Sequence, residues 1–308
     1  MAVLGPTASG KSAVAERLAE VHGAALVSVD SMQVYRGMDI GTAKPDRETR
    51  RRHTYHMIDV VDPADEYTVA EYQSAGTEHL DDLEASGTTA VIVGGSGLHF
   101  RALVDPLEFA PTSAELRSVL DATPGEHLTA ELTAADANAG DHVDLANLRR
   151  VVRAVEVLRL TGETPSDRAS TTAAAAVRSY EAVRPLVAIG LDPGPELAER
   201  IERRFDRMLT AGLVEEVDSL ADRLGITAAQ AVGYKELLRV VRGDSPLASA
   251  RDAAIASTRS LARRQRTYFK RDPRIRWLVW DHDPDRRFAA VRTAIEEASA
   301  EEASAWNS

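Results

Sequence analysis

The chain has 308 residues, of which 44% are hydrophobic and 28% charged, a composition typical of a globular protein with one large or two ordinary domains. It contains no cysteine, which excludes disulfides and thiolate zinc sites and fits a reducing compartment. No apolar run approaches the length of a membrane span, so we expect a cytoplasmic protein without a membrane partner. The net charge of -11 argues against a nucleic-acid partner unless basic residues gather locally.

The first motif follows a short apolar run at the start of the chain. Residues 5–12 read GPTASGKS and satisfy G-x-x-x-x-G-K-[ST]. The glycines let backbone N–H groups curl around an anion, Lys11 adds a positive charge, and Ser12 can hold Mg²⁺ beside it. The helix that begins here directs the positive end of its dipole at the same anion. We predict a phosphate site formed by Gly5, Pro6, Thr7, Ala8, Ser9, Gly10, Lys11 and Ser12.

A helix and a strand follow this loop. Residues 11–22 carry apolar side chains at helical spacing, and residues 24–29 form a short apolar run that ends at Asp30. A strand, a helix and a second strand predict a βαβ unit, whose ligands bind beyond the carboxyl ends of the strands. Asp30 is therefore expected near the phosphate site, where its carboxylate can serve as a metal ligand, a general base or a helix N-cap.

Residues 30–45 read DSMQVYRGMDIGTAKP, which is too polar for a core and too varied for a linker, so we predict a functional loop. Together with GPTASGKS, this loop closely resembles the tRNA dimethylallyltransferase family, whose members prenylate the adenosine next to the anticodon. Other segments are similar to the same family: HMIDVVDP at 56–63, VGGSGLHFRAL at 93–103, RRVVRAVEVLRLTG at 149–162, RFDRML at 204–209 and VGYKELL at 232–238. The resemblance spans essentially the whole chain.

The resemblance implies an enzyme that uses dimethylallyl diphosphate as donor and the exocyclic N6 amine of a tRNA adenosine as acceptor. The phosphate loop then holds a leaving diphosphate, with Mg²⁺ as cofactor at Ser12. An exocyclic amine is a poor nucleophile and needs a base, a role that Asp30 fits. The adenine must leave its stack to react, and we expect Asp30, Ser31, Met32, Gln33 and Ser96 to line its channel and contact the tRNA. The family usually has threonine at Ser96 and tyrosine at His99.

The middle of the chain differs in composition from both ends. Residues 106–179 show short helical patterns with Ala- and Asp-rich connections, which predict an inserted helical lobe. We therefore expect a P-loop NTPase-like α/β core of parallel strands flanked by helices at residues 1–105 and 180–308. In the family such an insertion grips the anticodon stem-loop, and the resemblance implies that Arg117 contacts tRNA there.

A second candidate cation lies on a helix that opens at Pro195. Its apolar stripe is Leu197, Ile201, Phe205 and Met208. Arg204 lies at the edge of that stripe, while Arg203 and Arg207 turn outward. The family has a functional arginine in this region, so we predict that Arg204 assists departure of the diphosphate, with Arg200 as the second choice.

The last third is predicted to hold helices at about 213–224, 227–242 and 246–271, a strand at 275–280 and a surface helix at 284–300. Residues 263–276 are the most basic segment and include Tyr268 and Phe269, a pattern that suits either an RNA contact or a solvated face. Some family members carry a zinc finger beyond this point, which a chain without cysteine lacks.

Two other functions remain open from the sequence. One is a prenyltransferase that acts on free AMP or ADP, and the other is a P-loop small-molecule kinase that binds and consumes ATP. We expect a monomer.

Overall fold

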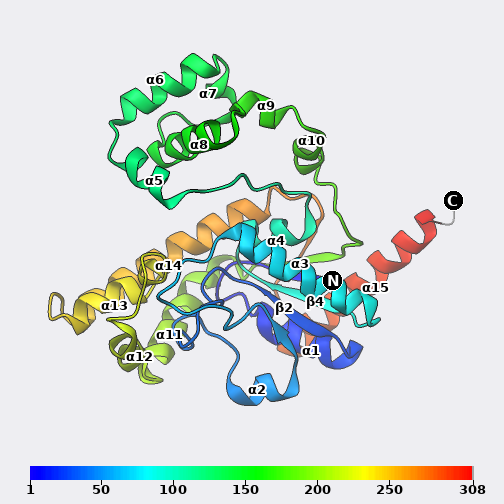
Figure 1. Ribbon diagram of the computed structural model, residues 1–308. Helices are drawn as coiled ribbons and strands as arrows, with labels where there is room; N and C mark the ends of the chain where they lie inside the picture. The colour runs from blue at the N-terminus through cyan, green and yellow to red at the C-terminus, as the bar shows by residue number, and fades with distance from the viewer. Residues whose placement is uncertain (307–308) are drawn as a thin grey trace. The chain divides into compact units, whose positions relative to one another are not determined.

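The computed structural model describes residues 1–306, with side chains placed for residues 1–300, and within this part six strands form one sheet (Figure 1). The strand order is β3-β2-β4-β1-β5-β6, and all the pairings are parallel. The strands are β1 (Ala2–Leu4), β2 (Ala25–Val29), β3 (Tyr55–His56), β4 (Ala90–Gly94), β5 (Ala188–Leu191) and β6 (Ile275–Leu278). The predicted parallel α/β fold is confirmed.

The composition of the strands matches their burial in the sheet. All residues of β1, β2 and β5 are buried, as expected of apolar runs in the middle of a parallel sheet covered on both faces. The edge strand β3 has only two residues, both partly buried. The phosphate-loop strand β1 thus lies inside the sheet, between β4 and β5.

The structure divides into two compact units, Met1–Val104 with Arg184–Ser308 and Asp105–Val183. The first unit contains the sheet and its helices: α1 (Lys11–His22), α2 (Arg47–Arg52), α3 (Val69–Ala85), α4 (Gly97–Val104), α11 (Leu197–Thr210), α12 (Leu213–Leu220), α13 (Tyr234–Val241), α14 (Leu247–Phe269) and α15 (Pro284–Trp306). Helices α1 and α15 bury side chains such as Leu18 and Val291 against one face of the sheet. Helices α3, α4 and α11–α14 supply the core on the other face.

The second unit is helical. Its elements are α5 (Ala114–Asp121), α6 (Gly125–Ala135), α7 (Ala139–His142), α8 (Leu148–Thr161), α9 (Pro165–Ala169) and α10 (Thr172–Arg178). Leu120, Leu128, Leu132, Val151 and Val155 form its own buried cluster. Across the residues described in both units, no helix combines the length and the apolar character needed to cross a membrane.

One long helix, α3, was not expected from the sequence. Its buried side contains only Tyr72, Gly76, Leu80 and Leu83, so its apolar stripe is weak. The signal that marks its start is the capping box of Thr68 and Glu71, in which each side chain bonds the other residue's backbone N–H.

Candidate active site

The register of the sheet aligns the ends of its central strands. Val29 of β2 and Leu4 of β1 both pair with Gly94 of β4. The loops that begin at Gly5 and Asp30 therefore start at the same level on either side of the end of β4, at the carboxyl edge where parallel sheets bind their ligands.

The phosphate loop is closely packed against its neighbouring strand. A Cβ atom on Gly5 would lie 2.2 Å from the carbonyl oxygen of Leu191 in β5, so only glycine fits. Ala8 and Gly10 have positive φ values of 63° and 82°. A loop with left-handed residues before a helix N-terminus is the kind of backbone that gathers N–H groups around an anion. Ser9 is buried, and its Oγ has no hydrogen-bond partner among the described residues.

Lys11 lies against this loop. Its Nζ donates a 3.3 Å hydrogen bond to the carbonyl of Pro6. Burial and the positive charge of Arg204 lower the pKa of Lys11 to about 8, while the negative charge of Asp30 opposes the change. Among the described residues, no carboxylate forms an ion pair with this ammonium group, so a bound anion would be its partner.

Asp30 brings a negative charge to the same place. Its Oδ1 accepts a 2.9 Å hydrogen bond from the N–H of Met32, and the residues that follow form turns, so Asp30 caps a turn and not a helix. The charge of Asp30 influences the pKa of four surrounding side chains: Lys11, Tyr72, His99 and Arg204. The carboxylate thus lies near two predicted site residues from separate segments, Lys11 and Arg204, and near Tyr72 and His99, which were not predicted.

Arg204 is placed by the packing of α11. Leu197, Ile201 and Phe205 are buried, Arg203 and Arg207 are exposed, and Arg204 is partly buried between these two faces. Burial lowers the pKa of Arg204, and Asp30 opposes this effect. Arg200, the second choice, also reaches the phosphate loop, because its Nε donates a 2.8 Å hydrogen bond to the carbonyl of Ala8.

Ser96 and His99 form a pair beside Asp30. Ser96 Oγ lies 2.7 Å from His99 Nδ1, and the imidazole packs edge-on against Tyr72 with ring centroids 4.5 Å apart. Burial lowers the pKa of His99 to about 4, so the ring is neutral near pH 7 and can only exchange a neutral hydrogen bond with Ser96.

The other residues predicted to line the adenine channel differ in whether their side chains are already bonded within the protein. Ser31 and Met32 are partly buried, and Met32 packs against the core. The amide of Gln33 is used within the loop: its Oε1 accepts from Ser28 Oγ at 2.8 Å, and its Nε2 donates to the carbonyl of Thr42 at 3.1 Å. Gln33 therefore holds the two ends of the loop together.

Comparisons with known proteins identify the family. The family model described as IPP transferase matches residues 33–272. The tRNA dimethylallyltransferase of Thermobifida fusca is 43% identical over 307 residues, which cover 94% of this chain and 93% of that protein. This chain belongs to the IPP transferase family. The resemblance found in the sequence is thereby confirmed.

Other members of the family extend the comparison. The tRNA dimethylallyltransferase of Streptomyces avermitilis is 44% identical over 287 residues, 90% of this chain and 89% of that protein. The crystal structure of the tRNA isopentenylpyrophosphate transferase of Bacillus halodurans, 32% identical, covers 100% of this chain and 98% of its own with a TM-score of 0.73. A eukaryotic dimethylallyltransferase acting on tRNA, 22% identical, shares the fold with a TM-score of 0.75 over 96% of this chain and 79% of its own.

Sequence reasoning missed the residues that hold the loop of this family member in place. The carboxylate of Glu216 on α12 accepts backbone hydrogen bonds from Asp39, Ile40 and Gly41 at 3.0, 2.7 and 3.0 Å, and also bonds the hydroxyl of Tyr234. A helix made of LVEEVDSL has two adjacent glutamates, and its pattern does not indicate which one turns inward.

Lys44 fixes the far end of the same loop. Its side chain is fully buried, and its Nζ donates to Asp39 at 3.1 Å and to Asp59 at 2.6 Å. A buried ammonium between two carboxylates is satisfied, so Lys44 organises the loop. The feature of the sequence that could have pointed to this role is a lysine inside a glycine-rich stretch.

Arg117, predicted to contact tRNA, has a partner within its own unit. The carboxylate of Glu156 is 1% exposed and accepts hydrogen bonds from Arg117 and from Arg153, the latter at 2.6 Å. Burial opposes the ionised form, yet the hydrogen bonds from both arginines hold the pKa of Glu156 below its usual range. Arg117 thus has a structural role, with a side chain that is still 36% exposed.

The basic segment 263–276 contains both paired and exposed cations. Arg266 pairs with Asp192 at 2.6 Å and Arg274 pairs with Asp272 at 2.7 Å. Phe269 is fully buried. The exposed cations are Arg263, Arg264, Lys270, Arg271 and Arg276, and Tyr268 is exposed as well.

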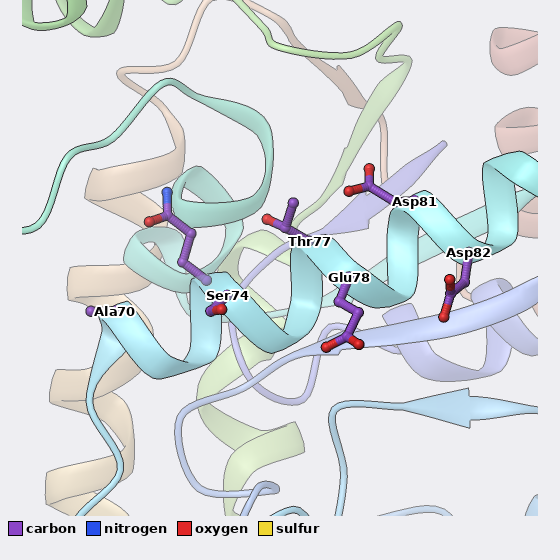
Figure 2. Close-up of a pocket in the computed structure, with 7 residues that line it drawn as sticks. Ala70, Ser74, Thr77, Glu78, Asp81 and Asp82 are labelled. Atoms are coloured by element: carbon purple, nitrogen blue, oxygen red, sulfur yellow. The ribbon is translucent and has the colours of Figure 1, made fainter.

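A surface hollow elsewhere does not contain the site. Figure 2 shows it along α3, from which its lining side chains project. They are Ala70, Gln73, Ser74, Thr77, Glu78, Asp81 and Asp82. Three carboxylates on one exposed helix face are unsuited to bind a diphosphate or an RNA backbone.

Proposed function

We propose that this protein transfers a dimethylallyl group from dimethylallyl diphosphate to the N6 amine of the tRNA adenosine on the 3′ side of the anticodon, with release of diphosphate. The observation that carries the proposal is the phosphate loop with Lys11 and Arg204 beside the carboxylate of Asp30. The names of the family relatives support the same activity.

The reaction requires a base for the attacking amine and positive charge for the leaving diphosphate. The N6 nitrogen forms a bond to the allylic carbon, the bond from that carbon to the diphosphate oxygen breaks, and its electron pair leaves with the diphosphate. Asp30 takes the proton that the amine loses. Lys11, Arg204 and the N–H groups of the loop neutralise the charge that grows on the leaving diphosphate.

Mg²⁺ fits this site as a partner of the substrate. Ser12 is exposed in the first turn of α1, and no group of three metal-binding side chains occurs among the described residues. Mg²⁺ commonly binds through few protein ligands together with phosphate oxygens and water, so we propose that Ser12 holds it against the diphosphate. When bound, the ion adds charge neutralisation to that of the loop.

We propose further that Ser31, Met32 and Ser96 line the path of the flipped adenine. The Ser96 hydroxyl is oriented by His99, so it presents a directed polar group where the family usually has a threonine. Gln33 contributes by holding the loop through its amide.

We propose that the unit Asp105–Val183 binds the anticodon stem-loop. Arg117 is partly exposed there and can contact a phosphate while its guanidinium remains bonded to Glu156.

The test is to incubate the protein with dimethylallyl diphosphate and unmodified tRNA and to analyse the nucleosides by mass spectrometry. We expect adenosine that carries one dimethylallyl group. Prenylation of free AMP in place of tRNA would favour the nucleotide prenyltransferase, and consumption of ATP would favour the kinase.

A further inference from the structure

The start of α1 contacts a segment from the other end of the chain. A Cβ atom built on Gly10 would lie 3.4 Å from Cη2 of Trp280. The same point lies 3.6 Å from an Nη2 atom of Arg200 and 3.6 Å from that of Arg287. Two guanidinium groups therefore converge on the phosphate loop, one from α11 and one from α15.

Trp280 organises these two arginines. The guanidinium carbon of Arg287 lies 4.2 Å from the centroid of the indole, and that of Arg200 lies 4.8 Å from it. Each arginine is also tied to a backbone carbonyl: Arg200 Nε to Ala8 at 2.8 Å, and Arg287 Nη1 to Asp281 at 2.7 Å. These contacts fix both side chains and leave both Nη2 atoms beside Gly10.

The two cations have unused hydrogen-bonding capacity. Arg287 is 8% exposed, and its Nε has no hydrogen-bond partner among the described residues. Trp280 Nε1 and Ser9 Oγ are buried beside the same loop and are equally without partners in that part of the chain. No carboxylate in the described residues forms an ion pair with Arg200 or Arg287.

In the free protein, burial disfavours the charged forms of Arg200 and Arg287, and nearby carboxylates favour them. Burial, followed by the charge of Arg200, lowers the pKa of Arg287, while Asp281 and Asp283 oppose that change. Burial also lowers the pKa of Arg200, with Glu196 acting in the opposite direction. An anion bound between these two partly desolvated cations would offset both the cost of their burial and their mutual repulsion.

We propose that Arg200 and Arg287, held by Trp280, form a second anion-binding position beside Gly10 that receives the outer phosphate of the diphosphate. This inference rests on the proposed function, because it assigns further contacts to the same leaving group. Trp280 and Arg287 lie after residue 272, where the match to the family model ends. The position thus adds contacts from the C-terminal segment to a cradle formed at the N-terminus.

The test is calorimetric titration of the full-length protein with inorganic diphosphate, without tRNA or allylic donor. We expect Arg287→Gln to weaken binding by about 10-fold to 100-fold, the range for loss of one charged hydrogen bond. Arg287→Lys, which keeps the charge but loses the planar fork, should weaken binding less. The matched control is Arg292→Gln on the same helix, whose residue pairs with Glu296 on the surface, and it should bind as the wild type does.

Thermal melting of each variant shows whether it is folded, and Arg200→Gln provides an independent variant from α11. Unchanged diphosphate affinity in folded Arg287→Gln and Arg200→Gln would overturn the inference. A parallel titration with ATP shows which phosphate compound the position binds. Variants that lose affinity for ATP but keep their affinity for inorganic diphosphate would also overturn the inference. The titration with inorganic diphosphate involves no prenyl transfer, so it tests only the second anion-binding position. The proposed function is tested separately, and failure of the wild type to modify tRNA would contradict it.

Discussion

Two sets of cations in this protein have opposite surroundings. In the unit Asp105–Val183, four arginines are paired with carboxylates: Arg117 and Arg153 with Glu156, Arg159 with Glu131, and Arg168 with Glu163. Around the phosphate loop, four cations have no carboxylate ion pair among the described residues: Lys11, Arg200, Arg204 and Arg287.

The presence or absence of a carboxylate partner distinguishes cations that stabilise the fold from cations that are available to bind an anionic ligand. A paired arginine has its charge compensated within the chain, so its removal affects mainly stability. A partly desolvated cation without such a partner gains most when an anion arrives. A protein with a net charge of -11 has ample carboxylates, and the absence of a carboxylate ion pair to these four cations among the described residues is consistent with an anionic substrate.

The largest expected effect concerns the carboxylate that faces these unpaired cations. Asp30→Asn retains an oxygen for the Met32 N–H, so the turn should persist while the base is lost. We expect the rate of prenyl transfer to fall by about 10²-fold to 10⁴-fold. Binding of tRNA and of inorganic diphosphate should be preserved, and single-turnover kinetics measures the change. Persistence of near-normal turnover would show that Asp30 is not the base.

Removal of an unpaired cation should reduce catalysis without a loss of stability. Arg204→Gln is expected to lower kcat by about 10²-fold to 10³-fold, as in other sites that stabilise developing negative charge. The neighbouring Arg203→Gln is the control, because Arg203 is exposed and pairs only with Glu199 on the helix surface. Equal kcat values for these two variants would contradict the assignment of Arg204.

Removal of a paired arginine should show the opposite behaviour. Arg117→Ala leaves Glu156 with Arg153 as its remaining arginine partner, and we expect about 1.5–3 kcal/mol of lost stability by denaturant unfolding. If Arg117 also contacts a phosphate, the logarithmic salt dependence of tRNA binding should fall by about one unit. Arg149 is an exposed residue of the same unit, and Arg149→Ala is the control for the loss of one positive charge from that unit. A tRNA binding curve identical to wild type would remove Arg117 from the RNA interface.

The smallest effect depends on pH. Because the pKa of Lys11 is lowered to about 8, its ammonium is charged below pH 8 and loses its proton above it in the free protein. Diphosphate should bind the wild type about tenfold more tightly than Lys11→Met at pH 7. That ratio should shrink between pH 8 and about pH 9.5, whereas a constant ratio would show that Lys11 does not titrate there.

The sequence indicated the fold class and supplied the candidate site residues. The phosphate loop, the strand before Asp30 and the inward edge of α11 at Arg204 are local patterns, and local patterns can be read without a structure. The contacts of Glu216 with residues 39–41 and of Arg287 with the phosphate loop join distant segments, so no local pattern encodes them. Arg117 shows the converse: its position in a motif did not reveal that Glu156 holds its side chain.

The central claim is that the phosphate loop holds a leaving diphosphate while Asp30 accepts a proton from an adenosine amine. The most direct measurement is the stoichiometry of a reaction containing protein, tRNA and dimethylallyl diphosphate, with released diphosphate and prenylated adenosine quantified together. We predict one diphosphate for each modified adenosine and no requirement for ATP. Diphosphate release without modified adenosine, or modification that depends on ATP hydrolysis, would contradict the claim.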